Sequence, residues 1–257
     1  MRSLAGKVTL VTGAARDRGI GRGIALVLAE HGCDVAVADV AYEDEGARRV
    51  AEIEALGRRA AFVKADFTDP AQANGAIGEV VARLGRLDVF CSNAGIATWE
   101  EVVDQQRETF ERVFAVNLHG CFYGCRAAAA QMRRQGDGGA IVVTSSVHAV
   151  MPFPQMGVYG ATKQAVGYLT GVMAREWARD RITVNHVGPG WIDTNINDAS
   201  PDFQTEEARR ATRAQIPFEH RAGDPCEIGE AVAYLAESTY TSGAYLRVDG
   251  AFVVGKH

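Results

Sequence analysis

A glycine-rich turn near the start of this chain constrains its fold more than any other feature. It lies at residues 13–21, between a β-branched apolar run at 7–12 and a helix-like stretch at 20–31. Glycines let the backbone approach a pyrophosphate at a helix N-terminus, where free N–H groups and the helix dipole favour anions. Between a strand and a helix, this glycine pattern predicts a dinucleotide-binding unit.

Strand-like and helix-like segments alternate along the rest of the chain. Such alternation predicts parallel strands joined by right-handed crossovers, and 257 residues with 47% apolar content suffice for one large core. We therefore expect residues 1–257 to form one α/β domain, a Rossmann-type doubly wound sheet of seven parallel strands. The expected strands lie near 7–12, 34–39, 60–64, 87–92, 139–145, 182–187 and 244–248, and the expected helices near 20–31, 43–56, 70–84, 105–134, 157–179 and 225–236.

One long stretch, residues 191–223, falls outside this alternation. It is too long and too polar to be an ordinary connection between a strand and a helix. In a doubly wound sheet the ligand binds at the carboxyl edge, where the strand order reverses. We expect residues 191–223 to form a lid over a substrate bound at that edge.

Tyr159 and Lys163 lie four residues apart in the helix expected at 157–179 and therefore share one of its faces. An ammonium about 4 Å from the phenol, at an effective dielectric near 20, contributes about 4 kcal/mol. That energy would lower a phenol pKa from about 10 to about 7. The pair predicts an acid/base tyrosine, although alone it could also be a solvated aromatic beside a surface lysine.

Five motifs in the same order resemble the short-chain dehydrogenase/reductase family, and the resemblance covers nearly the whole chain. They are Thr12-Gly13 with Gly19-Ile20-Gly21, then Asn93-Ala94-Gly95, then Asn117, then Ser146 with Tyr159 and Lys163, and finally Pro189-Gly190 with Ile192 and Thr194. The resemblance implies a catalytic tetrad of Asn117, Ser146, Tyr159 and Lys163. One departure is that five residues, 14–18, stand where the family usually has three.

The resemblance also implies a set of cofactor-binding residues. Asp39 ends the second strand 18 residues after Gly21, where a carboxylate binds the adenosine ribose and repels a 2′-phosphate. NAD is therefore favoured, and NADP stays open because Arg16 and Arg18 could pair with such a phosphate. The implied set is Gly13, Arg16, Gly19, Ile20, Gly21, Asp39, Asp66, Phe67, Asn93, Ala94, Gly95, Tyr159, Lys163, Pro189, Gly190, Ile192 and Thr194.

Each tetrad residue has an expected role in hydride transfer between a nicotinamide and a secondary alcohol or ketone. Tyr159 moves the hydroxyl proton, and Ser146 donates a hydrogen bond to the developing oxyanion. Lys163 lowers the phenol pKa and, by resemblance, holds the nicotinamide ribose, while Asn117 orients a water that links Lys163 to solvent. Ser145 competes with Ser146, but the thirteen-residue offset to Tyr159 favours Ser146.

The expected substrate contacts are Ser146, His148, Gln155 and Trp191. Residues 146–148 and 152–154 are similar to the same stretch of glucose 1-dehydrogenases and related sugar dehydrogenases. We therefore expect a sugar, a polyol or a small cyclic alcohol.

Two other functions stay open. One is a 3-oxoacyl-thioester reductase, since the chain also resembles 3-oxoacyl-acyl-carrier-protein reductases, and its docking patch would consist of Arg133, Arg134, Arg175 and Arg179. The other is a non-catalytic dinucleotide sensor. A pure sensor would need only the binding turn, so the intact tetrad argues against it.

Composition limits the remaining possibilities. A net charge of −5 with scattered Arg and Lys residues gives no footprint for nucleic acid. No apolar run approaches the length of a bilayer span and no signal peptide precedes the first strand, so we expect a cytoplasmic protein without membrane contact. Five cysteines without close pairs predict reduced thiols and no metal site.

The helix expected at 157–179 carries apolar residues on more than one face. Such a helix needs cover from the sheet and from a second subunit. With the stretch at 105–134 it could form the four-helix interface typical of the family, and residues 248–254 resemble the segment that completes a tetramer. We expect a homotetramer.

Overall fold

A parallel sheet of seven strands runs through the centre of the computed structural model, which describes residues 1–198, 200 and 203–254. The strand order is β3-β2-β1-β4-β5-β6-β7 and every neighbouring pair is parallel. The strands are β1 (Val8–Thr12), β2 (Asp34–Asp39), β3 (Ala60–Lys64), β4 (Val89–Ser92), β5 (Gly139–Thr144), β6 (Ile182–Pro189) and β7 (Tyr245–Val248). This arrangement confirms the predicted Rossmann-type doubly wound sheet, with the order reversing between β1 and β4.

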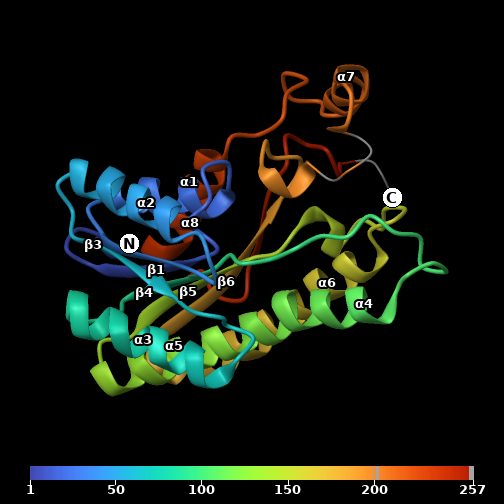
Figure 1. The fold of residues 1–257 in the computed structure, drawn as a ribbon. Coiled ribbons are helices and arrows are strands. Elements are labelled where there is room, and N and C mark those ends of the chain that lie inside the picture. The colour runs from blue at the N-terminus through green and yellow to red at the C-terminus, as the bar shows by residue number, and fades with distance from the viewer. Residues whose placement is uncertain (199, 201–202, 255–257) are drawn as a thin grey trace.

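Helices cover both faces of the sheet, so that it forms the middle of three layers (Figure 1). The helices α1 (Ile20–Glu30), α2 (Glu43–Ala55) and α8 (Pro225–Glu237) lie on one face, and α3 (Pro70–Leu84), α5 (Cys121–Gln135) and α6 (Gly157–Trp177) lie on the other. Every residue of β1, β4, β5 and β6 is buried. Burial on both faces explains why these strands read as nearly continuous apolar runs. None of the described helices combines the length and the apolar character of a membrane span.

The predicted elements end within two residues of the observed ones, but one predicted helix is divided. The stretch expected as a helix at 105–134 consists of α4 (Arg107–Phe114), a π-helical turn η1 (Ala115–Gly120) and α5. Asn117 lies inside the π-helical turn. Wider turns of this kind are rare and recur at functional sites, because they re-aim one side chain without ending the helix.

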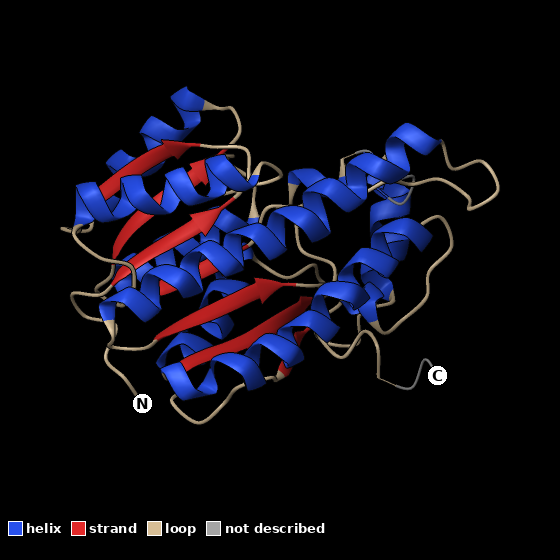
Figure 2. Ribbon diagram, turned by 90° about the horizontal axis from the view of Figure 1, so that it is seen from below, coloured by secondary structure: helices blue, strands red, loops and turns tan. Residues whose placement is uncertain are grey.

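Helices on the α5–α6 face continue past the carboxyl ends of the strands (Figure 2). The N-terminus of α6, which carries Tyr159, lies at this edge, together with the lid predicted at 191–223. The segment expected to be a lid contains one helix that the sequence pattern did not predict, α7 (Glu206–Ala214), which lies apart from the sheet (Figure 1). The two ends of the lid are joined by a parallel bridge between Ile192 and Gly223.

Two glycines allow α1 and α8 to pack at backbone contact. A Cβ added to Gly23 would lie 2.4 Å from the backbone carbon and oxygen of Pro225, and one added to Gly229 would lie 2.8 Å from the Gly23 oxygen. Gly78, on the exposed side of α3, has no atom within 4 Å of the same position.

This contrast predicts opposite effects of the same substitution. Gly23→Ala should lower the free energy of unfolding by about 1–3 kcal/mol, because backbone cannot yield to the added methyl group. Gly78→Ala should raise it by about 0.5–1 kcal/mol through helix propensity. Chemical denaturation of both variants measures the two changes, and an equal change of the same sign would show that the α1–α8 contact is loose.

Candidate active site

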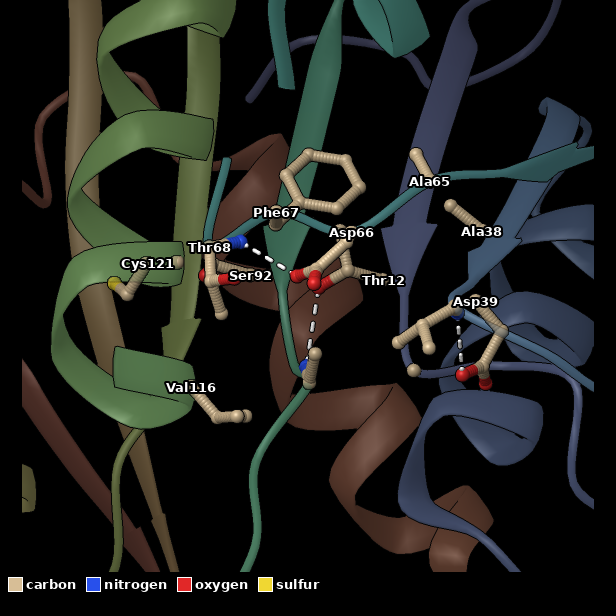
Figure 3. Close-up of a pocket in the computed structure, with 14 residues that line it drawn as sticks. Thr12, Ala38, Asp39, Ala65, Asp66, Phe67, Thr68, Ser92, Val116 and Cys121 are labelled. Carbon is tan, nitrogen blue, oxygen red and sulfur yellow. Dashed lines mark hydrogen bonds between the residues drawn. The ribbon is translucent and has the colours of Figure 1, made fainter. Parts of the chain in front are cut away.

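A cleft of about 430 Å³ opens at the carboxyl edge of the sheet, at the point where β1 and β4 diverge (Figure 3). The ends of four strands and the start of α5 form its walls. The cleft is lined by Thr12, Gly13, Ala38, Asp39, Val40, Ala65, Asp66, Phe67, Thr68, Ser92, Ala94, Val116, Gly120 and Cys121. Four residues predicted to bind the cofactor, Gly13, Asp39, Asp66 and Phe67, meet Ala94 in this wall although they lie far apart in sequence.

The glycine turn beside this cleft is shaped as a cradle that side chains would fill. Gly13 has a φ of +63°, which favours glycine, and a Cβ on it would lie 2.8 Å from Ala94 Cα. A Cβ on Gly21 would lie 2.3 Å from the Gly13 oxygen. Gly19 precedes Ile20 at the start of α1, and no side chain caps this helix N-terminus. The cradle and the uncapped N–H groups fit the pyrophosphate of a dinucleotide.

The hydroxyl of Thr12 joins the ends of β1 and β4. It accepts hydrogen bonds from the backbone N–H groups of Asn93 and Ala94, both at 3.0 Å. The Asn93 side-chain amide donates to the carbonyl oxygens of Thr12 (3.0 Å) and Gly13 (3.1 Å), and its oxygen accepts from Thr144 Oγ1 at 3.2 Å. Asn93 thus connects the glycine turn to the ends of β1 and β5.

Asp39 and Asp66 are both held by backbone donors. Asp39 accepts from the N–H groups of Val40 (2.9 Å) and Ala15 (3.3 Å), and burial raises the pKa of its carboxyl group. Asp66 accepts from the N–H of Thr68 at 2.8 Å and so forms a turn (Figure 3). Both side chains still line the cleft, at the positions expected for a ribose and an adenine.

The lengthened part of the glycine turn fastens to two other segments of the fold. Asp17 pairs with Arg48 (3.2 Å) and with the buried Arg49 (2.8 Å) on α2. Arg18 pairs with two lid carboxylates, Asp193 at 2.8 Å and Asp198 at 3.4 Å.

Backbone and ring contacts add to these ion pairs. The carbonyl oxygen of Arg18 accepts from the N–H of Asn195 at 2.9 Å. Arg16 lies over the Tyr42 ring, with 5.4 Å between the guanidinium carbon and the ring centroid. Arg18 is therefore bound to the segment after β6, and only Arg16 of the two arginines stays beside Asp39, where its charge offsets part of the rise in the carboxyl pKa that burial causes.

Ser146, Tyr159 and Lys163 lie together beside the carboxyl end of β5. The Ser146 side chain faces Tyr159, and Lys163 Nζ lies 5.5 Å from the centroid of the tyrosine ring. Lys163 Nζ donates to the carbonyl oxygen of Thr144 at 2.9 Å. Both side chains are buried, Tyr159 at 8% exposed and Lys163 at 4%.

The predicted lowering of the phenol pKa is wrong for this structure. Burial raises the pKa of Tyr159 to about 12, and the nearby Ser146 hydroxyl offsets only part of this rise. Burial also lowers the pKa of Lys163 to about 8, so both groups are driven toward their neutral forms. Helix spacing correctly put Lys163 on the same side of the helix as the tyrosine ring, but it carried no information on how deeply the pair is buried.

Asn117 contacts the catalytic helix and the loop after β4. Its side-chain oxygen accepts from the N–H of Ile96 at 2.9 Å, and its amide donates to the Ile96 oxygen (2.9 Å) and to Thr162 Oγ1 (3.1 Å). Thr162 is the neighbour of Lys163 on α6. These bonds tie the π-helical turn to the candidate catalytic helix.

The two adjacent serines face different partners. Ser145 Oγ donates to the Lys163 carbonyl oxygen at 3.0 Å, whereas Ser146 Oγ accepts from the His148 N–H at 3.1 Å and faces Tyr159. The sequence analysis missed Tyr245 on β7, whose hydroxyl donates to the Ser146 carbonyl oxygen at 2.9 Å. No sequence spacing relates these two residues, because they are 99 positions apart.

The segment after β6 begins at Pro189, the last residue of that strand, and leads into residues 191–223. A Cβ on Gly190 would lie 2.8 Å from Asp249 Cα, so this turn packs against the end of β7. Ile192 pairs with Gly223, and Thr194 Oγ1 donates to the Ile192 oxygen at 3.4 Å. The segment expected to hold the carboxamide therefore also forms the base of the lid.

Aromatic rings line the substrate side of the site. The His148 ring meets Tyr159 edge-on at 6.3 Å and Trp191 at 6.1 Å, and it also contacts Phe153 at 5.3 Å between centroids. Burial lowers the pKa of His148, which therefore stays neutral near pH 7. Gln155 has a φ of +65°, and its carbonyl oxygen accepts from the Glu100 N–H at 3.1 Å. Of the four expected substrate residues, His148 and Trp191 are in ring contact and Ser146 adjoins them through the His148 N–H, whereas Gln155 contacts Glu100.

Comparison with known proteins agrees with this geometry. A family described as enoyl-(acyl carrier protein) reductase matches residues 13–252. The chain is 41% identical to an L-rhamnose 1-dehydrogenase (NAD(P)(+)) of a Sphingomonas species, over 99% of both chains.

Solved structures agree as well. A carveol dehydrogenase of Mycobacterium avium in complex with NAD superposes with a TM-score of 0.92 at 27% identity, covering 99% of this chain and 100% of the other. An acetoin dehydrogenase of Enterobacter cloacae superposes with a TM-score of 0.85 at 37% identity, covering 97% and 96%. The chain belongs to the short-chain dehydrogenase/reductase family and is an NAD(P)-dependent enzyme that acts on CH–OH groups.

Proposed function

We propose that this protein is a dehydrogenase of a sugar, polyol or small cyclic alcohol, with Asn117, Ser146, Tyr159 and Lys163 as its catalytic residues. The meeting of the buried Ser146, Tyr159 and Lys163 side chains beside the carboxyl end of β5 carries the proposal. The relative with 41% identity, a sugar dehydrogenase, supports the substrate class.

Tyr159 transfers the proton of the substrate hydroxyl, and Ser146 stabilises the negative charge on the substrate oxygen. Tyr159 Oη accepts the hydroxyl proton of an alcohol during oxidation and returns it to the carbonyl oxygen during reduction. Ser146 Oγ donates to the same oxygen as charge develops on it. The nicotinamide, when bound, supplies or accepts the hydride.

Lys163 and Asn117 position the reacting groups and pass protons between them and solvent. The Lys163 ammonium, fixed by the Thr144 carbonyl, stabilises the phenolate of Tyr159 and reaches the ribose of the cofactor. Asn117 holds α6 through Thr162 and, with its second oxygen lone pair, orients a water that passes protons from Lys163.

NAD is the preferred cofactor in this proposal. The Asp39 carboxylate lies at the cleft wall and repels a 2′-phosphate. Arg18 is paired with Asp193 and Asp198, so it does not provide a free cation for that phosphate. Arg16 is the nearby arginine through which NADP could still bind.

Thioester reduction is the second candidate, favoured by the description of the matching family. A carrier protein would need free arginines at its docking surface. Arg133 is already paired with Asp180 at 2.6 Å, and Arg134 donates to Gln131 at 2.6 Å. These contacts leave fewer free arginines in the docking patch expected from the sequence, which weakens the case for a thioester reductase. The assembled proton-transfer groups argue against a sensor without catalysis.

We also propose a homotetramer that works in the cytoplasm. Phe110 on α4, Phe122 on α5, and Tyr168 and Val172 on α6 are 36–79% exposed, and these helices lie on the same side of the sheet (Figure 1). Exposed apolar side chains on neighbouring helices suit a subunit interface. The five free cysteines support a reducing compartment.

Replacing Tyr159 tests the proposed chemistry. Tyr159→Phe removes the proton carrier and keeps the ring, so kcat should fall by about 100-fold or more, while the dissociation constant of NADH, measured by fluorescence titration, stays the same. Tyr168→Phe on the exposed side of the same helix is the matched control and should keep full activity. A Tyr159→Phe enzyme with most of its activity would assign the proton transfer to another group.

The pH dependence follows from the raised pKa of Tyr159. Oxidation needs the deprotonated phenol, which is scarce below a pKa of about 12, so kcat/KM for alcohol oxidation should rise with pH from 6 to 8. The rise should flatten above a pH of about 8, where Lys163 loses its proton. Carbonyl reduction uses the protonated phenol and should not rise over this range. Initial rates in both directions measure these profiles, and oxidation that weakens with rising pH would contradict the assignment.

Light scattering tests the tetramer. The expected mass is four times that of the 27.5 kDa chain. Tyr168→Asp places a charge on the proposed interface and should shift the mass toward the dimer or monomer, while Tyr240→Phe, at a fully exposed position elsewhere, should not. A monomeric wild-type protein at micromolar concentration would refute the proposal.

A further inference from the structure

We propose that Thr98 and Trp99 form a hydroxyl-binding subsite, and that the substrate therefore carries at least one hydroxyl besides the one that is oxidised. This inference rests on the proposed dehydrogenase function and narrows its substrate to sugars and polyols.

The polar atoms of these two side chains are buried without partners. Thr98 Oγ1 and Trp99 Nε1 have no hydrogen bond to any described residue. Buried polar atoms in folded proteins are nearly always paired, because an unpaired one keeps its full cost of desolvation. The other unpaired buried atoms in the described part of the chain are isolated in sequence: Arg2 and Arg49 have further hydrogen bonds through their guanidinium groups, and Thr9 and His186 lie within β1 and β6. Two adjacent residues that both lack partners call for a ligand.

A series of ring contacts connects Trp99 to the candidate proton carrier. Trp99 stacks on Trp191, with 6.3 Å between centroids and 9° between planes. Trp191 meets His148 at 6.1 Å, and His148 meets Tyr159 at 6.3 Å. Trp99 therefore belongs to the group of aromatic rings that borders the candidate reacting centre on the side of His148.

The backbone around the subsite is held on both sides. Ile96, two residues before Thr98, exchanges two hydrogen bonds with Asn117. Glu100, directly after Trp99, donates its N–H to Gln155, and its carboxylate accepts from Gln105 at 2.6 Å. Preorganised groups of this kind bind a ligand without first being ordered.

The chemistry of the region favours a neutral hydroxyl over an ion. The indole N–H only donates, whereas the threonine hydroxyl can donate and accept, and a sugar hydroxyl matches both. The surrounding side chains are apolar: Met151, Phe153, Phe203 and Phe252 pack around Trp191. A carboxylate would need a cation there, and His148, the titratable ring among them, is kept neutral by burial, which lowers its pKa. A substrate with a single hydroxyl, such as a monohydroxysteroid, would leave both protein groups unpaired.

Two nearly isosteric variants test the subsite. Thr98→Val removes the hydroxyl, and Trp99→Phe removes the N–H while keeping a ring against Trp191. For each variant, kcat/KM should fall by about 10- to 100-fold on the best substrate from a panel of aldohexoses, deoxyhexoses and alditols, mainly through KM. On cyclohexanol it should change by less than about twofold, since this alcohol has no second hydroxyl to lose a partner. Tyr240→Phe is the control variant, and NAD affinity should be unchanged throughout.

The outcomes separate the subsite from the proposed function. Equal losses on both kinds of substrate, no loss on either, or a wild-type enzyme that prefers cyclohexanol to the whole panel would overturn the subsite and leave the dehydrogenase intact. If the wild-type enzyme turns over nothing, the proposed function fails, and binding decides the subsite instead. The Trp99 indole N–H resonance is identified by its loss in Trp99→Phe. In the presence of NAD, this resonance should shift when members of the panel are added and should not shift when cyclohexanol is added. An unmoved resonance would overturn the inference.

Discussion

The rest of the site depends on the two hydrogen bonds that the Thr12 hydroxyl accepts. This hydroxyl binds the N–H groups of Asn93 and Ala94 where the strand order reverses, and Asn93 passes the connection to Thr144. The carbonyl of Thr144 in turn accepts from Lys163. One continuous network of hydrogen bonds therefore joins the phosphate cradle to the cation beside Tyr159. Because each bond has a fixed partner, the cofactor wall and the candidate catalytic helix are positioned together.

Burial sets the electrostatics of the candidate active site. Tyr159 and Lys163 are both shifted toward neutrality, so the site disfavours charge until a partner stabilises it. The same exclusion of water strengthens every hydrogen bond and charge interaction inside the site. In the proposed mechanism, the Ser146 hydroxyl and the Lys163 ammonium would therefore act with little competition from solvent when charge develops on a substrate oxygen.

Sequence patterns predicted the sheet, the flanking helices and the meeting of Ser146, Tyr159 and Lys163. They succeeded because apolar periodicity and motif order depend on local geometry, which this fold does not override. They missed the π-helical turn at Asn117, since an extra residue in one turn leaves the residue composition of a helix unchanged. The depth of the Tyr159 environment and the Tyr245 contact to Ser146 depend on distant strands. Helix α7 had a readable signal, Thr205 capping Ala208 ahead of two glutamates, which the polarity of the lid obscured.

The two additional residues in the glycine turn alter how the molecule is assembled. Fully extended, two residues add at most about 7 Å of chain, and here Asp17 is paired with Arg49 on one flank and Arg18 with Asp193 on the other. Through these two ion pairs, the lengthened glycine turn connects α2 to the segment after β6. In this chain, the turn expected to contact the phosphates is therefore bound both to α2 and to the segment after β6.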